Sequence, residues 1–250
     1  MQNCCIVIPC YNEAGRLNFN LIDTYLNDQK DVVLVFVNDG SRDDTFDMLQ
    51  AFKEKKPVRI FTVDLQTNAG KAQAVRHGIL FALNEIKPDY IGYLDADLST
   101  PLIEMDKMFA YLDGNKNSKV IFGSRVKRMG STIKRSWIRH YTGRVFATLI
   151  SAMLDLPIYD SQCGAKVMTA ERASTLFQDE FLTTWLFDIE FLFRYKNLFG
   201  VKRTLTEIYE YPLFEWIENK GSKIRFYDLF AVPVDLIRIY LHYSRKSSIS

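Results

Sequence analysis

The sequence predicts an α/β protein whose mixed, mostly parallel sheet is flanked by helices, with an amphipathic helix at the C-terminal end. Two observations lead to this prediction. Apolar runs of strand length alternate with helix-length segments over the first 120 residues, which is the pattern of βαβ units. The apolar runs are continuous rather than interrupted by polar residues, as in parallel strands that are buried on both faces.

The expected elements of the first half follow one another without a linker. Strands are expected over residues 4–9, 31–38, 58–64, 90–94 and 120–123, which are rich in apolar residues. Helices are expected over residues 13–27, 43–53, 69–85 and 101–112, and the last begins with a proline, which suits a first helical turn.

The second half is less regular. It predicts helices over 133–154 and 187–198, a short strand over 165–169, a strand-rich segment over 202–216 and an amphipathic helix over 226–243 with Pro233 inside it. Because no repeat or linker interrupts the chain, we expect one domain over residues 1–250. Residues 1–124 would form a nucleotide-binding half, and residues 125–250 an acceptor half that ends in a membrane-facing helix.

Composition excludes several classes of protein. The 250 residues are 48% hydrophobic and 25% charged, which is typical of a globular protein and not of a disordered chain or a coiled coil. A net charge of +2 is too near neutral for a general nucleic-acid binder. The four cysteines lack metal-ligand spacing, and no run approaches 18 uncharged apolar residues. We therefore expect a cytoplasmic protein without a spanning helix.

Polar residues gather where the first four expected strands end. Tyr11 and Glu13 follow the first strand, Asp39 follows the second, Asp64 ends the third, and Asp95 and Asp97 follow the fourth. Ligands of open α/β sheets bind at the carboxyl ends of strands, and two carboxylates at such an end can share a hard divalent cation such as Mg²⁺ or Mn²⁺. As an alternative, each residue alone could be a helix cap or a turn residue.

No other nucleotide-binding motif competes with this site. A dinucleotide-binding fold would carry GxGxxG after the first strand, where this chain has PCYNEAG. The closest match to a P-loop, NAGKA, lacks both the first glycine and the hydroxyl residue. PCYNEAG also argues against a sugar nucleotidyltransferase, which would carry a glycine-rich loop at this place.

Positive charge is concentrated in one segment. Residues 114–154 contain no Asp or Glu and carry Lys116, Lys119, Arg125, Lys127, Arg128, Lys134, Arg135, Arg139 and Arg144. The segment is either a solvated basic face or a site for a phosphate or an anionic membrane surface. The apolar side of the C-terminal helix is expected either to pack in the core or a homodimer, or to lie at a membrane interface.

Five motifs, in this order and spacing, resemble the family 2 glycosyltransferases of the GT-A fold. They are IVIPCYNEAGRL, VNDGSRDDT, NAGKAQAVRHGI, YLDADLSTP and GSR. DSQCGAKVMT, WLFDIE and ENKGSKI are similar to the branch of dolichyl-phosphate β-glucosyltransferases and their bacterial polyprenyl-phosphate relatives. The resemblance covers nearly the whole chain.

The resemblance implies a role for each matching position. The nucleoside would be held by Pro9, Tyr11, Glu13 and Asp39, with Asp39 accepting a hydrogen bond from the base, and the nucleotide site would include Asn68, Gly70, Lys71 and Ala96. Asp95 and Asp97 would bind the metal and the diphosphate. The acceptor phosphate would be held by Arg125, Arg135, Arg139 and Lys223. Two departures, Ala165 and Ser99, suggest a roomier pocket and disfavour mannose as the sugar.

These expectations combine into an inverting transfer of a hexose, with UDP-glucose favoured, to a polyprenyl phosphate at the inner face of a membrane. Such a phosphate is largely dianionic at pH 7 and needs no general base. The main alternative is transfer to a saccharide hydroxyl, which would need Asp188 or Glu190 as a base. A non-enzymatic nucleotide-binding protein on a membrane is a further alternative. The expected partners include a second copy of the chain or a membrane partner protein.

Overall fold

The computed structural model describes residues 3–134, 137–218 and 226–247 and contains one seven-stranded sheet with the order β3-β2-β1-β4-β7-β5-β8. Its strands are β1 (Cys4–Cys10), β2 (Val32–Asp39), β3 (Ile60–Leu65), β4 (Tyr90–Leu94), β5 (Val120–Ser124), β7 (Ala165–Thr169) and β8 (Ile208–Pro212). Only β7 runs antiparallel to its two neighbours. The predicted mixed, mostly parallel sheet is therefore confirmed.

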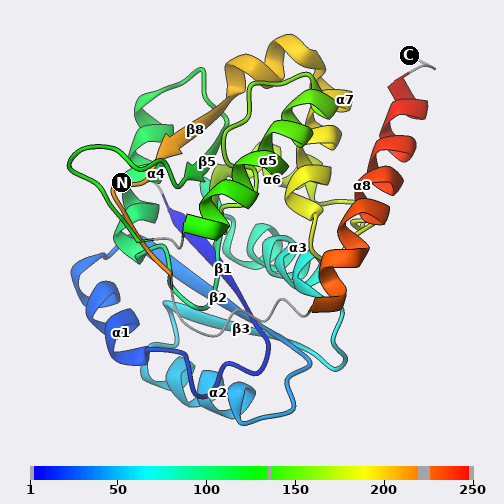
Figure 1. Cartoon of the computed structure of the whole chain (residues 1–250). Helices are drawn as coiled ribbons and strands as arrows, with labels where there is room; N and C mark the ends of the chain where they lie inside the picture. The colour runs from blue at the N-terminus through cyan, green and yellow to red at the C-terminus, as the bar shows by residue number, and fades with distance from the viewer. Residues whose placement is uncertain (1–2, 135–136, 219–225, 248–250) are drawn as a thin grey trace.

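Helices cover both faces of the sheet (Figure 1). Their bounds are α1 (Phe19–Asp28), α2 (Thr45–Lys55), α3 (Lys71–Phe81) with the π-helical turn η1 (Ala82–Ile86), α4 (Leu102–Gly114), α5 (Trp137–Leu154), α6 (Ala170–Leu176), α7 (Phe187–Glu207) and α8 (Phe226–Ser247). One core lies between the sheet and α1, α2 and α4, and the other between the sheet and α3 and α5–α8. Burial on both faces explains the continuous apolar strands of the sequence.

Two predicted segments are wrong in part. Residues 202–207, expected to be strand-rich, extend α7 beyond a kink at Gly200, where φ is +80°. Residues 133–134, expected to open a helix, belong to β6 (Thr132–Lys134), which pairs in parallel with β9 (Glu215–Ile217). The pairing of β6 with β9 joins segments far apart in the chain, which local periodicity does not report.

The first helix also begins later than predicted. Residues 13–17 form a turn in which the carbonyl of Glu13 accepts hydrogen bonds from the amides of Arg16 and Leu17. Helix α1 starts only after Asn18, whose side chain accepts from the amide of Leu21 as a helix cap. The polar motif that follows β1 is thus kept out of the helix and lies at the carboxyl edge of the sheet.

Candidate active site

The carboxylate of Asp39, at the end of β2, organises the loop that precedes α3. It accepts hydrogen bonds from the amides of Ala69 at 2.8 Å and Gly70 at 3.0 Å, and from the side-chain amide of Asn68 at 3.1 Å. Burial raises its pKa above the ordinary value even though both backbone amides lower it. Gly70 has φ of +87°, so this turn favours glycine. Asp39, Asn68 and Gly70, predicted separately, therefore form one unit.

Lys71, the first residue of α3, reaches the end of β4. Its ammonium lies 2.5 Å from Oδ1 of Asp95, and this lysine is only partly exposed. Although burial lowers the pKa of Lys71, the carboxylates of Asp95 and Asp188 raise it above the ordinary value. The lysine therefore stays charged at neutral pH and brings positive charge to the predicted diphosphate site.

Arg16 connects the end of β1 with the end of β4. Its guanidinium lies 3.5 Å from the carboxylate of Glu13 and 4.0 Å from Oδ2 of Asp97. The other oxygen of Asp97 accepts a hydrogen bond from the amide of Ser99 at 2.9 Å. The carboxyl ends of β1, β2 and β4 thus place alternating charges along one edge of the sheet.

The predicted metal site provides two carboxylates, from Asp95 and Asp97. Their side chains are 40% and 30% exposed, so both are open to a ligand, and Asp95 already accepts a cationic group from Lys71. In the part of the chain that the structure describes, no three His, Cys, Asp or Glu side chains gather as a complete metal site. Two oxygen ligands fit Mg²⁺ or Mn²⁺ that takes its other ligands from phosphate and water.

The remaining predicted nucleotide residues lie at the same edge. Pro9 is in β1 opposite Val37, and Tyr11 follows that strand directly. Glu13 is buried and its amide donates to the hydroxyl of Thr45 at 2.7 Å. Ala96 is buried between the two aspartates of the β4 end.

Arg125, which follows β5, forms a two-pronged ion pair with Asp160. Its Nε and one terminal nitrogen each lie 2.7 Å from a carboxylate oxygen, and its backbone amide donates to the same group at 3.0 Å. The amides of residues 159 and 160 in turn donate to Glu210, whose pKa is raised by burial. The pair is therefore anchored to β8.

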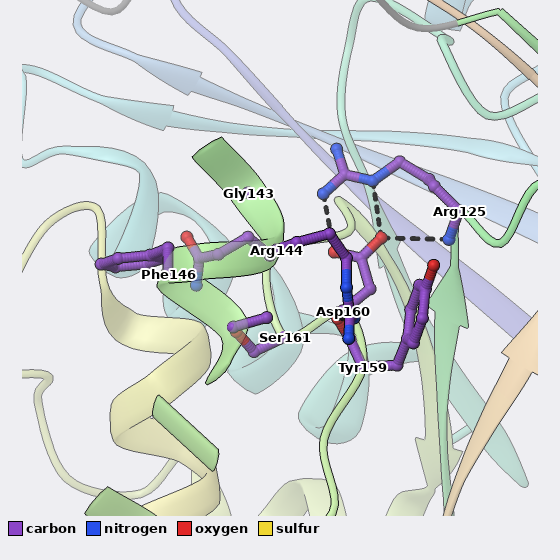
Figure 2. A pocket seen from close by; sticks show the side chains of 9 residues that line it. Arg125, Gly143, Arg144, Phe146, Tyr159, Asp160 and Ser161 are labelled. Carbon is purple, nitrogen blue, oxygen red and sulfur yellow. Dashed lines mark hydrogen bonds and ion pairs between the residues drawn. The ribbon is translucent and has the colours of Figure 1, made fainter. Parts of the chain in front are cut away.

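A small pocket of about 40 Å³ opens beside this ion pair (Figure 2). Arg144, from α5, lies against the ring of Tyr159, with its guanidinium carbon 3.8 Å from the ring centre. Gln162 also lines the pocket, and its buried Nε2 has no hydrogen-bond partner among the described residues. An unsatisfied donor beside two guanidinium groups suits an anionic ligand.

The sequence matches Glycosyl transferase family 2 over residues 5–177. The chain belongs to this family. The resemblance on which the sequence prediction relied is thereby confirmed.

The relatives of this family 2 glycosyltransferase include several dolichyl-phosphate beta-glucosyltransferases. The chain is 31% identical over 246 residues to one from Trichomonas vaginalis, covering 94% of this chain and 72% of that protein. It is 29% identical over 252 residues to the protein of Dictyostelium discoideum, with 95% and 74% covered. The human protein is 29% identical over 260 residues, with 95% and 75% covered.

Solved structures share the GT-A fold. Glucosyl-3-phosphoglycerate synthase from Mycobacterium tuberculosis, in complex with Mn²⁺, UDP and phosphoglyceric acid, matches with a TM-score of 0.69 at 17% identity. The match covers 97% of this chain and 78% of that one. The predicted GT-A fold is confirmed.

Two carboxylates considered as general bases are enclosed in this family 2 enzyme. Asp188 has a side chain that is 4% exposed, and its Oδ1 lies 2.8 Å from the ammonium of Lys166 and accepts from the hydroxyl of Tyr93. Glu190 is fully buried and accepts from the amide of Leu182, from Arg194 and from Tyr243. Neither environment suits a residue that must take a proton from a bound substrate.

Three predicted acceptor residues cannot be placed by their side chains. Arg135 and Lys223 lie outside the described residues, and Arg139 lies in α5 where only the backbone is described. Arg125 is described, but two of its guanidinium nitrogens are committed to Asp160. The acceptor site assigned from the sequence therefore stays a prediction.

Arg16, Asp160 and Lys166 were given no role from the sequence. All three lie within the motifs that carried the resemblance, in YNEAGRL and DSQCGAK. Their place in these motifs was the one sign in the sequence that they belong to the site. Their partners, however, come from other strands and loops and become visible only in the folded chain.

Proposed function

We propose that this glycosyltransferase transfers glucose from UDP-glucose to a polyprenyl phosphate, with inversion at the anomeric carbon and with bound Mg²⁺ or Mn²⁺. The observation that supports this most strongly is the match to dolichyl-phosphate beta-glucosyltransferases over about 95% of the chain. The charged edge formed by the ends of β1, β2 and β4 supplies the groups that such a donor requires.

Asp39 and Glu13 would bind the nucleoside, together with Pro9, Tyr11 and Ala96. Asp39 already holds the loop of residues 68–70, so one carboxylate would fix both this loop and the base. An aspartate can accept from the N–H of uracil, which agrees with UDP as the donor.

Asp95 and Asp97 would hold the metal ion, and Lys71 and Arg16 would flank the diphosphate. When bound, the ion would neutralise charge that develops on the departing diphosphate. Lys71, charged at neutral pH, would exchange part of its ion pair with Asp95 for contacts to phosphate oxygens. The salt contacts of Arg16 would keep Asp97 in place.

The acceptor phosphate would enter between β5 and α5. We place it beside the pocket of Arg125, Arg144 and Gln162, with Arg135, Arg139 and Lys223 completing the site. The buried Nε2 of Gln162 has no partner within residues 3–134, 137–218 and 226–247, and a phosphate oxygen would satisfy it. Asp160 would orient Arg125 through the two-pronged ion pair.

No general base is needed for this acceptor. A phosphate monoester has a second pKa of about 6, so most of it is a dianion at pH 7 and attacks without losing a proton. This agrees with the enclosed positions of Asp188 and Glu190. The protein would then act by holding the two substrates in register and by stabilising the leaving group.

Peripheral membrane contact would bring the enzyme to its lipid. Within residues 3–134, 137–218 and 226–247 no helix has the length and apolar character needed to cross a bilayer. On α8, large apolar side chains are exposed on one side: Val234, Ile237, Tyr240 and Leu241. An amphipathic helix of this kind suits the interface between water and lipid.

The test is a transfer assay. Purified protein is incubated with Mn²⁺ or Mg²⁺, UDP-glucose and a short polyprenyl phosphate, and lipid-linked glucose is measured. We expect product with the wild type and loss with Asp97→Ala and Arg139→Ala. Metal-dependent binding of UDP-glucose without a lipid product would instead point to a hydroxyl acceptor.

A further inference from the structure

A buried ion pair joins strand β7 to helix α7, close to the proposed donor site. The side chain of Lys166, in β7, is 0% exposed, and its ammonium lies 2.8 Å from Oδ1 of Asp188 in the first turn of α7. Tyr93 donates a hydrogen bond to the same carboxylate oxygen. The ammonium also lies 4.5 Å from the ring centre of Phe122.

A buried ion pair of this kind is not expected to stabilise the folded state more than apolar residues would. Moving both charges out of water costs more than their attraction commonly returns, and apolar residues of similar volume are often as stable or more so. Lys166 sits opposite Tyr93 in β4 and opposite Phe122 in β5, where an apolar side chain would pack well. The charges therefore call for an explanation other than stability.

The pair is joined to the donor site through a turn. The ammonium of Lys166 donates to the carbonyl of Cys163 at 2.7 Å, and the next residue, Gly164, accepts a hydrogen bond from the amide of Asp95 at 3.1 Å. A methyl group added to Gly164 would lie 2.0 Å from Oδ2 of Asp95. The turn that Lys166 holds thus lies directly against a carboxylate of the proposed metal site, with no room for a side chain at Gly164.

The other member of the pair is tied to Lys71. Phe187 precedes Asp188 at the start of α7, and the ammonium of Lys71 lies 5.8 Å from the centre of its ring. Lys71 in turn pairs with Asp95 at 2.5 Å. Both residues of the buried pair are therefore connected to the Lys71–Asp95 ion pair. Lys166 is connected through the turn at Gly164, and Asp188 through the neighbouring Phe187.

We infer that Lys166 and Asp188 are positioning residues that hold the Asp95 carboxylate and Lys71 in the geometry that a metal–diphosphate group requires. The inference rests on the proposed donor site and assigns Asp188 a different task from that of a general base. Its chemistry is local: one buried ammonium fixes a backbone carbonyl, and one buried carboxylate neutralises that ammonium.

The decisive variant is Lys166→Met/Asp188→Asn. It removes both charges, shortens the side chain at residue 166 by one atom, and leaves Tyr93 an amide oxygen to which it can donate. Binding of UDP is measured by calorimetry with Mn²⁺ and with EDTA, and unfolding is followed by circular dichroism. We expect the Kd for UDP in Mn²⁺ to rise at least tenfold, the Kd in EDTA to rise by a smaller factor because Lys71 also contacts phosphate, and the protein to remain folded.

Two further variants separate positioning from stability. Gly164→Ala displaces Asp95 and leaves the charges of Lys166 and Asp188 in place, so it should reproduce the loss of Mn²⁺-dependent affinity for UDP. This variant tests the inference even if the double variant fails to fold. Arg172→Met/Glu207→Gln removes another largely buried ion pair, beyond the opposite end of β7. It should change stability and leave the Kd for UDP in Mn²⁺ unaltered.

The outcomes are distinct. Wild-type affinity for UDP in Mn²⁺, retained by the folded double variant or by Gly164→Ala, would overturn the positioning role and leave the proposed function intact. Wild-type protein whose affinity for UDP does not respond to Mn²⁺ or Mg²⁺ would overturn both, because the donor site itself would then be wrong.

Discussion

Asp39 shows how much one carboxylate can determine. It accepts hydrogen bonds from two backbone amides and one side-chain amide of the loop before α3. The residue that follows this loop, Lys71, places its ammonium beside Asp95 at the end of β4. A carboxylate is a pure acceptor, whereas an asparagine side chain presents a donor on one side. The identity of this residue therefore governs the shape of the loop.

Asp39→Asn is expected to weaken UDP binding at least tenfold, because its NH₂ group would face a backbone amide of Ala69 or Gly70. Calorimetric titration with UDP and Mn²⁺ measures the effect. Asp47→Asn, which removes a carboxylate from the first turn of α2, serves as the control. Equal affinity of Asp39→Asn and the wild type would show that the loop does not depend on this acceptor.

Asp106, on α4, makes stability depend on pH. Burial raises the pKa of its carboxyl to about 6, although the hydrogen bond from Tyr25 lowers it. The folded state thus binds the proton more tightly than the unfolded state, whose pKa is near 3.8. The stabilisation is complete below pH of about 4 and is lost as the pH rises through about 6.

Asp106→Asn is therefore expected to be more stable than the wild type above pH of about 6 and not below pH of about 4. Two pKa units correspond to about 3 kcal/mol, and partial exposure of the group reduces this to about 1–2 kcal/mol. Urea unfolding at pH 4 and pH 7.5 measures the difference between the two proteins. The same difference at both values would show that this carboxyl does not titrate as described.

At the scale of the element, the sequence predicted what local patterns determine. The strands at residues 90–94 and 165–169 have the predicted bounds, because each is a compact apolar run. Residues 202–207 were expected to be strand-rich but are helical, and the hydroxyl of the β-branched Thr204 donates to the carbonyl of Gly200. Its burial against the fold outweighs its strand propensity.

The same limit applies to the site. The residues at the β1, β2 and β4 ends could be found from the sequence, because parallel strands bring their carboxyl ends to one edge. The pairing of Arg125 with Asp160, or of Lys166 with Asp188, could not, because each joins elements whose relative placement depends on the antiparallel strand β7. The enclosed position of Asp188 follows from the second pairing.

Glu190, also in α7, is enclosed by its partners as Asp188 is. Its carboxylate joins α7 to the loop before it and to α8, through Leu182, Arg194 and Tyr243. Glu190→Gln is expected to cost about 3 kcal/mol of stability, because it leaves the largely buried guanidinium of Arg194 without its charged partner.

Urea unfolding measures the cost of Glu190→Gln, with the exposed Glu180→Gln as control. Under conditions where the variant is folded, its transfer activity should be unchanged. A fully folded Glu190→Gln protein that has lost transfer activity would instead support the general-base role that the buried position argues against.

At the scale of the whole molecule, strands from both halves of the chain share one sheet. β7 and β8 come from the second half and β1–β5 from the first, and α3 and α5–α8 lie over a common core. We propose on this basis a single domain in which residues 1–124 bind the donor and residues 125–250 the acceptor. A homodimer and a membrane partner protein stay predictions from the sequence.

The proposed membrane contact gives the last prediction. On α8, Ile237 and Leu241 are 58% and 48% exposed and lie one turn apart on the same side of the helix. Burying a leucine-sized side chain in an apolar environment contributes about 1.5–3 kcal/mol, so moving two such residues from lipid to water weakens binding at least tenfold.

We expect Ile237→Asp/Leu241→Asp to lose cosedimentation with phosphatidylcholine vesicles that contain anionic phosphatidylglycerol, while its affinity for UDP in Mn²⁺ stays unchanged. The control is Leu21→Asp, which introduces one aspartate at an exposed leucine of α1, on the other face of the sheet. Transfer to a polyprenyl phosphate in vesicles should fall with vesicle binding, whereas transfer to the same acceptor dissolved in detergent should persist. Equal vesicle binding by the double variant and the wild type would mean that the exposed side of α8 faces something other than lipid.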